Sequence, residues 1–480
     1  MIDVVIIGAG VTGCAIAREL SKLRLSVAVY ERGEDVCNGT SKANSAIIHS
    51  GHSTKPGSNM ARMNVAGNAM YTAICDELDV PLKRIGSLNV AFSPEQLPGL
   101  DKLLADGKAN GVPDMRIIDA DELHRMEPCL APEACGALLA QTSGIICPYE
   151  LTIALAENAA INGVEFHRST PVKSVAKIDG GWLVALEDGC AVQCRAVVNA
   201  AGVYSDIFNN MVSERKIHVI PRKGEYWMVD KSYANSFKHT IFQLPGPMGK
   251  GILVSPTVDG TLILGPTAQD IDDKDDTDTT TDGLANVSAT AVKIWPSMPR
   301  NAFITTFAGI RAHLASHDFV LGEPDDAPFF FNAAGIESPG LTSAPAIAQE
   351  LAAQIADRLG AKRKDDYRPG RPQVVRFREL DNAARAKLIE KDAAFGRIVC
   401  RCETVTEAEV RASIRRPVGA RSIDGVKRRT RSGMGRCQGG FCMPRVLAIL
   451  AEELKCSPLE ITKCGGKSFI LTDKLHGGNL

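Results

Sequence analysis

The chain has 480 residues, which is enough for two or three domains, and its net charge at pH 7 is −1. This balance gives no reason to expect a nucleic acid or another polyanion as a partner. No apolar run approaches the roughly 20 residues of a membrane-spanning helix, while peripheral membrane contact remains compatible with the composition. The 14 cysteines, with no signal peptide before the first strand, predict reduced thiols in a cytoplasm.

The first 31 residues carry the pattern of a dinucleotide-binding βαβ unit. We expect an apolar strand at 3–7, a glycine turn at 8–13, a helix at 14–23 and a second strand at 26–30 that ends in Glu31. A bare G-x-G-x-x-G is a weak signal. In this complete context it is a strong one for a dinucleotide.

Each residue of this turn has a physical role. Gly8 makes the tight turn, Gly10 lets the backbone approach a pyrophosphate, and Gly13 lets helix and strand pack closely. The helix N-terminus carries partial positive charge that favours phosphates. Glu31 can accept a hydrogen bond from a ribose hydroxyl. The predicted dinucleotide contacts are therefore Gly8, Gly10, Thr12, Gly13 and Glu31.

Two cysteine pairs in the last quarter of the chain predict a metal centre. Cys400 and Cys402 form a C-x-C pair, and Cys437 and Cys442 form a glycine-rich C-x4-C pair 34 residues later. Four thiolates can hold a [2Fe–2S] cluster, because each iron takes two sulfur ligands from the protein. Zinc is the main rival, but zinc sites favour C-x2-C pairs. Four unrelated cysteines are the remaining alternative.

The predicted cluster favours FAD over NAD as the dinucleotide. No second G-x-G-x-x-G follows a strand later in the chain. A carrier restricted to hydride would be poorly matched to a one-electron centre, whereas a flavin takes up two electrons and releases them singly. Cys37 stands alone after the second strand, which argues against a dithiol reductase.

The rest of the chain alternates strands and helices without internal repeats. A mixed, strand-rich region is expected from 217 to 320, with a solvated Asp- and Thr-rich loop at 270–282. The charged segment 361–372 contains proline and glycine and marks a domain boundary. Helices are expected beyond it at 406–415 and 444–455.

Several of these segments resemble the D-amino-acid-oxidase superfamily. Within it they are similar to the branch of FAD-dependent glycerol-3-phosphate dehydrogenases and L-2-hydroxyglutarate oxidases. The segments are the N-terminal fingerprint, 44–51, 55–57, 197–202 and 308–311. Residues 398–407 and 433–442 resemble the bacterioferritin-associated-ferredoxin-like [2Fe–2S] domain, which is often fused to anaerobic-type glycerol-3-phosphate dehydrogenases.

The resemblance implies an α/β protein with a Rossmann-like FAD-binding domain, a mixed or antiparallel-sheet substrate domain and a small C-terminal iron–sulfur domain. Residues 1–360 would form the oxidoreductase module, followed by a linker at 361–394 and the [2Fe–2S]-binding domain at 395–480. Within the module, the FAD parts would be about 1–85, 145–215 and 325–360, and the substrate parts about 86–144 and 216–324.

The resemblance also implies a set of flavin contacts beyond the fingerprint. They lie in the loop after the second strand, in two strands or strand ends near the middle of the chain, and before the last helix of the module. They are Thr40, Ser41, Asn44, Ser45, Val172, Ala201, Gly202, Gly335, Gly340, Leu341 and Thr342.

Arg311 and His49 are the implied catalytic residues. Arg311 would orient a small anionic alcohol, because guanidinium is a permanently charged fork for carboxylate or phosphate oxygens; a structural salt bridge is the alternative. His49 would take the hydroxyl proton, or else hydrogen-bond the flavin or a carbonyl. Ala312 replaces a proline common in the family, so His313 can face the site instead. Further substrate contacts would come from Lys250 and Thr267, and from Arg222 and Lys223.

The implied reaction is oxidation of a secondary alcohol with an anionic tail. We rank sn-glycerol 3-phosphate first because of the fused cluster domain, and a 2-hydroxy acid such as L-2-hydroxyglutarate second. An amino-acid or hydroxyproline dehydrogenase comes third, and a non-catalytic electron-transfer subunit is the remaining hypothesis. Electrons would leave through the [2Fe–2S] cluster to a second flavoprotein or a small redox subunit.

Overall fold

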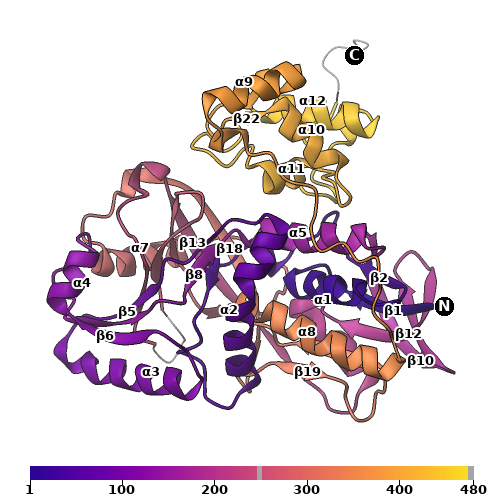
Figure 1. The fold of residues 1–480 in the computed structure, drawn as a ribbon, viewed down its shortest axis with the longest axis horizontal. Coiled ribbons are helices and arrows are strands. Elements are labelled where there is room, and N and C mark those ends of the chain that lie inside the picture. The colour runs from indigo at the N-terminus through magenta and orange to yellow at the C-terminus, as the bar shows by residue number, and fades with distance from the viewer. Residues whose placement is uncertain (246–250, 474–480) are drawn as a thin grey trace.

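Two lobes lie side by side in the computed structural model, and a smaller unit formed by the last part of the chain sits across them (Figure 1). The structure describes residues 1–245 and 251–473. Both lobes are built on mixed sheets, and the third unit is mostly helical. The predicted α/β class with three parts is therefore confirmed. No helix in these described ranges is both long and apolar enough to cross a membrane.

The first lobe is built around a sheet whose strand order is β10-β11-β12-β1-β2-β9, with β20 also paired to β12 and β19 paired to β20. Its central strand β1 is apolar, and Val4, Val5 and Ile6 are completely buried. This strand runs parallel to both β2 and β12, so the carboxyl ends of all three meet at one edge. The strands are β1 (Ile2–Ile7), β2 (Val27–Tyr30), β9 (Glu165–His167), β10 (Val172–Ile178), β11 (Gly181–Leu186), β12 (Ala191–Asn199), β19 (Val320–Gly322) and β20 (Phe330–Ala334).

The helices of this lobe pack on one another beside the sheet. Helix α1 (Val11–Ser21) packs against both α5 (Pro148–Ile161) and α8 (Gly340–Leu359), and α8 packs against α2 (Asn59–Leu78). Two of them start with a recognisable signal: Ser58 caps α2, and proline occupies the first position of α5. The buried apolar side chains of these helices pack against those of β1 and form the main hydrophobic core of the lobe.

The second lobe is built around a largely antiparallel sheet with the order β17-β13-β16-β15-β14-β5-β7-β6 and β18 on the other side of β13. The long ladder between β13 and β18 places Arg222 directly opposite Arg311. Its strands are β5 (Ser87–Ala91), β6 (Met115–Asp119), β7 (Gly136–Ala140), β13 (Val219–Val229), β14 (Thr240–Gln243), β15 (Leu253–Pro256), β16 (Leu262–Gly265), β17 (Gln269–Asp270) and β18 (Phe303–Leu314). Its helices are α3 (Leu97–Ala109), α4 (Ala120–Met126) and α7 (Thr281–Ile294). Outside the two large sheets lie helix α6 (Ser205–Val212) and a small sheet with the order β3 (Ile47–Ile48), β8 (Gly144–Ile146) and β4 (Leu82–Lys83).

The Asp- and Thr-rich segment expected as a solvated loop does more than face water. Asp270 belongs to β17 and forms an ion pair with Arg222. Asp276 forms an ion pair with the buried Lys223, at 2.7 Å. The segment therefore supplies counter-charges to strand β13, which sequence proximity could not indicate.

The segment predicted as a linker lies along the first lobe. The backbone of Arg363 forms an isolated antiparallel β-bridge with that of Leu23, and the Arg371 side chain donates to the carboxylate of Glu157 at 2.8 Å. Helix α9 (Asn382–Lys391) then begins at the Asp381 cap, within the same predicted segment. The chain is thus held to the first lobe before it enters the third unit.

The third unit contains a two-stranded sheet and three further helices. They are β21 (Ile398–Cys400), β22 (Val405–Thr406), α10 (Glu407–Arg415), α11 (Ile423–Thr430) and α12 (Met443–Leu454). The helices predicted at 406–415 and 444–455 are confirmed. Helix α10 starts with a capping box between Thr406 and Glu409, which is the local signal that made it predictable.

Buried ion pairs fasten this unit to the first lobe. The Asp35 carboxylate is completely buried and accepts from Arg428 at 3.0 Å and from Arg429 at 2.6 Å. Glu157, also completely buried, accepts from Arg416 at 2.6 Å. A buried charge that loses its partner destabilises a protein strongly. The unit is therefore fixed in one orientation rather than tethered loosely.

We predict that Asp35→Asn lowers the free energy of unfolding by about 3 kcal/mol at neutral pH, because two buried guanidiniums lose their counter-charge. Burial alone would raise the pKa of Asp35, but Arg429 and then Arg428 lower it to about 2 from its ordinary 3.8. The stabilisation is therefore complete above about pH 4 and is lost as the pH falls through about 2. Urea unfolding of both proteins should show a constant difference from pH 5 to 8 that shrinks below pH 4; equal midpoints at pH 7 would contradict this role.

Candidate active site

One large cavity, about 1790 Å³ in volume, extends across all three parts of the molecule. It begins at the carboxyl ends of β1 and β2, passes the loop at 38–46 and reaches β13 and β18 of the second lobe. Residues of α11 and of the loop before α12 also contribute to its wall. Typical ligand pockets are roughly 300–1,000 Å³. This volume suits a dinucleotide together with a second, smaller molecule.

The glycine turn at the start of α1 is as tight as the fingerprint requires. Gly8 has φ +100, and a Cβ there would lie 2.6 Å from the Ala200 carbonyl oxygen. A Cβ on Gly13 would lie 2.0 Å from the Gly8 carbonyl oxygen. Gly13 thus lies inside the helix–strand contact, whereas Gly8, Gly10 and Thr12 line the cavity. This cradle fits the pyrophosphate of FAD, as expected from the sequence.

Glu31 has two tasks at the end of β2. One carboxylate oxygen accepts the Ala9 N–H at 2.8 Å, and the other accepts the Gly33 N–H at 2.7 Å. Glu31 also lines the cavity, close to the strand end that carries Val172. The carboxylate therefore holds the glycine turn in shape and still faces the position of the predicted ribose.

The loop that follows β2 is clamped between the two lobes. The Ser41 hydroxyl accepts from the Val11 N–H at 2.9 Å, and Thr40 donates to the Ile310 carbonyl oxygen of β18. A Cβ on Gly309 would lie 1.9 Å from the Ala43 carbonyl oxygen, so only glycine permits this approach. The clamp places Thr40, Ser41, Asn44 and Ser45 on the cavity wall.

His49 lies on the cavity wall between the start of α8 and strand β14. Its backbone N–H donates to the Thr342 hydroxyl at 2.9 Å, and its Nε2 lies 3.4 Å from the Ser338 hydroxyl. Its ring lies 5.8 Å from the ring of Phe242, measured between centroids. Thr342 does not line the cavity; it holds the backbone of His49 in place.

Arg311 presents a guanidinium to the cavity without a carboxylate partner. Its Nη2 donates to the carbonyl oxygens of Thr267 and Lys223, and it forms no ion pair with any residue in 1–245 or 251–473. A Cβ on Gly224 would lie 2.8 Å from this nitrogen, so the glycine makes room for it. Burial lowers the pKa of Arg311, while Tyr226 opposes this change. An incoming anion would satisfy the remaining N–H donors.

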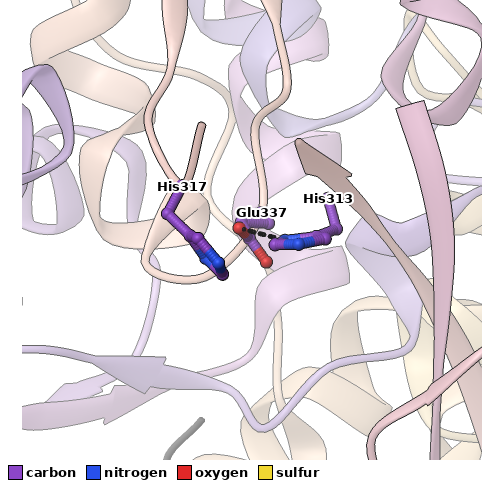
Figure 2. Close-up of side chains that lie close together, drawn as sticks. All are labelled: His313, His317 and Glu337. Atoms are coloured by element: carbon purple, nitrogen blue, oxygen red, sulfur yellow. Dashed lines mark hydrogen bonds and ion pairs between the residues drawn. The ribbon is translucent and has the colours of Figure 1, made fainter. Parts of the chain in front are cut away.

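Figure 2 shows that His313 points to Glu337. Its Nδ1 lies 2.8 Å from a Glu337 carboxylate oxygen, and its ring centroid lies 4.6 Å from that of His317. His313 is buried and does not line the cavity, so the structure does not bring this expected substrate contact to the site; Glu337 and His317 do line it. The ligand atoms of the three residues lie within 4.8 Å of one another. Both Arg311 and Arg222 act electrostatically on Glu337, which disfavours a cation there.

The remaining predicted contacts divide into three groups. On the cavity wall are Val172, Ala201, Gly202, Thr267, Gly340 and Leu341. Gly335 lies away from the wall in a turn with φ +66, where a Cβ would meet Leu314. Lys250 lies outside the described residues.

Several residues of the wall carried no signal in the sequence. Tyr226 hydrogen-bonds Ser45 at 3.2 Å, and Phe242 lies beside His49. Tyr149 starts near the first turn of α5 and reaches the cavity from the side of the third unit. These side chains come from separate strands and helices, and only the long-range pairing of the sheets brings them together.

The four predicted metal ligands lie in the third unit: Cys400 ends strand β21, and the other three lie in the loops after β21 and before α12. The sulfur atoms of Cys402 and Cys437 are 3.7 Å apart. The neighbouring Cys442 lowers the pKa of the Cys400 thiol, whereas Cys400 raises the pKa of Cys442. A Cβ on Gly435 would lie 2.2 Å from the Cβ of Cys402. The glycines thus let the two loops close on a compact centre, as a [2Fe–2S] cluster requires.

Met434 connects this cysteine-bearing loop to the cavity. It lines the cavity wall, and its sulfur accepts from the Tyr149 hydroxyl at 3.4 Å. Cys402 is exposed, and the neighbouring Phe441 side chain is 85% exposed. The cysteine site therefore lies between the cavity and a surface open to a partner.

Comparisons with known proteins agree with these features. The family model "FAD dependent oxidoreductase" (DAO) matches residues 3–354, and "BFD-like [2Fe-2S] binding domain" matches residues 398–452. A glycerol 3-phosphate dehydrogenase of Caloramator mitchellensis is 47% identical over 98% of both chains. A glycerol 3-phosphate oxidase of Mycoplasma pneumoniae is 32% identical over 72% of this chain and 93% of its own.

The structure of the L-alpha-glycerophosphate oxidase of Mycoplasma pneumoniae, determined in its dithionite-reduced form with FAD bound, superimposes with a TM-score of 0.74 at 30% identity. The match covers 78% of this chain and 99% of that one, so the shared part is the oxidoreductase module. The predicted family and both predicted cofactors are confirmed. The chain belongs to the FAD dependent oxidoreductases of the DAO family and carries a BFD-like [2Fe-2S] binding domain in its C-terminal part.

Proposed function

We propose that the protein oxidises sn-glycerol 3-phosphate to dihydroxyacetone phosphate and passes the electrons through its [2Fe–2S] cluster to a partner protein. The observation that carries the proposal is the guanidinium of Arg311, which faces the cavity and forms no ion pair within the described residues. The relative from Caloramator mitchellensis, named as a glycerol 3-phosphate dehydrogenase, supports it because the similarity covers the cluster domain as well.

Arg311 would bind the phosphate group of the substrate. Arg222 lies opposite it on the same face of the β13–β18 ladder, but Asp270 neutralises Arg222. The cavity wall therefore keeps one guanidinium without an ion-pair partner at this position, to which phosphate oxygens can bind bidentately. Thr267 lies next to it on the wall. Binding at the phosphate would hold the alcohol carbon in place for reaction.

His49 would remove the proton of the substrate hydroxyl. Its backbone is fixed by Thr342, and its Nε2 lies near Ser338 on the cavity side. A neutral imidazole can accept a proton near pH 7 and release it to solvent afterwards. When bound, FAD would accept the hydride from the same carbon and release the two electrons one at a time.

The electron acceptor would be a second flavoprotein or a small redox subunit that meets the exposed side of the cluster loops. The cysteines Cys400, Cys402, Cys437 and Cys442 would be the cluster ligands. All 14 cysteines lie in the described ranges and are unpaired there, which suits the cytoplasm as the proposed location.

The function is tested by anaerobic reduction of the purified holoprotein. We expect sn-glycerol 3-phosphate to bleach the flavin absorbance at about 450 nm within seconds. L-2-hydroxyglutarate, tested in parallel, should bleach it far more slowly, since its chain is longer and ends in carboxylates. Bleaching by the hydroxy acid alone would assign the protein to that second substrate class. If neither compound lowers the flavin absorbance, the proposed reaction is refuted.

We predict that Arg311→Gln raises the KM for sn-glycerol 3-phosphate about 100-fold, equivalent to about 3 kcal/mol of lost charge-assisted binding. Arg311→Lys should recover only part of this loss, because lysine keeps the charge but not the fork. The measurement is steady-state kinetics with an artificial acceptor. Arg300→Gln, an exposed position in the same lobe, serves as the control; an unchanged KM in Arg311→Gln would remove Arg311 from the site.

We predict that Cys402→Ser abolishes the EPR signal of the reduced [2Fe–2S] cluster while FAD remains bound, because an iron loses one of its two protein ligands. Flavin reduction by substrate should persist, whereas electron transfer to a protein acceptor should stop. Cys190→Ser, which changes an exposed cysteine of the first lobe, is the matched control. A full cluster signal in Cys402→Ser would show that the ligand set is different.

A further inference from the structure

Helix α11 of the [2Fe–2S] domain faces the cavity that begins at the FAD fingerprint. Asp424, Lys427 and Arg428 of this helix line the same cavity as Gly10 and Thr12. The described wall is therefore not formed by the oxidoreductase module alone. Any cofactor bound at the start of α1 shares its cavity with side chains of the cluster domain.

Lys427 has no carboxylate partner in the described part of the chain. The nearest acid on its own helix, Asp424, is already paired with Lys463, at 2.8 Å. Burial lowers the pKa of Lys427, which shows that its ammonium is poorly hydrated. A half-buried ammonium without a counter-ion is costly unless an anion approaches it.

Arg428 is also incompletely satisfied. It is 6% exposed, and its Nη2 lies 3.0 Å from Asp35 and 3.5 Å from Glu34. Its Nε has no hydrogen-bond partner within the described structure. Arg429 already donates twice to Asp35, at 2.6 and 2.7 Å. The Asp35 carboxylate is therefore shared between Arg428 and Arg429, and their two positive charges face one fully buried carboxylate.

Positive charge exceeds negative charge around this part of the cavity. Among the described residues, Glu34 and Asp35 are the two carboxylates that form ion pairs with basic side chains of α11. Asp424, the acidic residue of α11, is paired with Lys463 outside the helix. The cations gathered there are Lys42, Arg168, Lys427, Arg428 and Arg429. The surplus indicates a site for an anion that carries more than one negative charge.

Lys42 connects this charge cluster to the start of α1. It directly follows Ser41, whose hydroxyl accepts from the Val11 N–H. Its Nζ donates to the neutral Asn38 at 3.2 Å and forms no ion pair within the described residues. Burial and then the nearby Arg428 lower the pKa of Lys42, so the cations of the two domains act on each other. The first turn of α1 has no acidic residue, so its partial positive charge adds to theirs.

We propose that the [2Fe–2S] domain completes the FAD site: Lys427 and Arg428 supply positive charge to the cofactor's pyrophosphate, opposite the N-terminus of α1. FAD then binds across two domains, and its binding and the docking of the cluster domain stabilise each other. Such coupling is reciprocal by thermodynamic necessity. It also keeps the cluster loop, through Met434, on the wall of the cavity that holds the flavin. This coupling between FAD binding and domain docking involves the two cofactors alone and does not depend on the substrate.

The test is the affinity of flavin-free protein, with its cluster intact, for FAD. In Lys427→Gln we expect the Kd for FAD, measured by quenching of flavin fluorescence, to rise at least tenfold. Lys467→Gln, an exposed lysine of the same domain, should leave the Kd within twofold of the wild type. The visible circular dichroism of the cluster should be the same in all three proteins, which shows that the domain is folded. A Kd in Lys427→Gln equal to that of the control would overturn the proposal.

The reciprocal effect gives a second measurement. FAD should raise the temperature at which the wild-type cluster signal is lost, and this rise should be much smaller in Lys427→Gln. If Lys427→Gln does not fold, Lys427→Met and the salt dependence of FAD binding to the wild-type protein replace it. We expect the wild-type Kd to increase at least tenfold between 50 and 500 mM NaCl, estimated as roughly one or two ion contacts; a Kd that is independent of salt would exclude an electrostatic contribution.

Discussion

The position of the third unit, and with it part of the cavity wall, depends on the buried contact between Asp35 and the arginines of α11. A carboxylate that is completely removed from water is tolerated only with hydrogen-bonded counter-charges, and here they come from a domain almost 400 residues away in sequence. Glu157 with Arg416 repeats this arrangement on α5. Two such contacts, in different places on the interface, allow one docked orientation. The iron–sulfur domain is therefore a fixed part of the wall of the shared cavity.

The fixed orientation places the two faces of the cluster loops in different environments. Met434 lies on the cavity wall with Tyr149 as its hydrogen-bond donor, whereas Cys402 and Phe441 lie at the surface. The exposed Cys402 and Phe441 leave the cluster loops accessible to a partner without any movement of the domain. An acceptor needs only to approach the exposed side, where an aromatic side chain is available for contact. This arrangement suits a dehydrogenase with a protein acceptor.

Local patterns in the sequence predicted the glycine turn and the cysteine cluster. The fingerprint Gly8–Gly13 and the four cysteines are defined by spacing within short segments, and the close approaches at Gly13 and Gly435 explain why glycine is required there. Arg311 was predictable only through family resemblance. The orientation of His313 depends on Glu337, which lies beyond two further strands, so no spacing rule indicates it. Lys427 carried no signal at all, because it belongs to another domain and reaches the cavity only through docking.

The contrast among three cations on β13 and β18 separates structural from functional charge. Lys223 is paired with Asp276 and Arg222 with Asp270, as expected for cations whose role is to stabilise the sheet. Arg311 lies directly opposite Arg222, which is unfavourable for like charges, and still has no carboxylate partner in the described ranges. Its Nη2 is held by two backbone carbonyl oxygens, which fix its direction without neutralising its charge. The fold pairs the neighbouring cations with carboxylates but leaves Arg311 without one. The free protein therefore carries an unfavourable electrostatic free energy at this position, and binding of an anionic group there would relieve it.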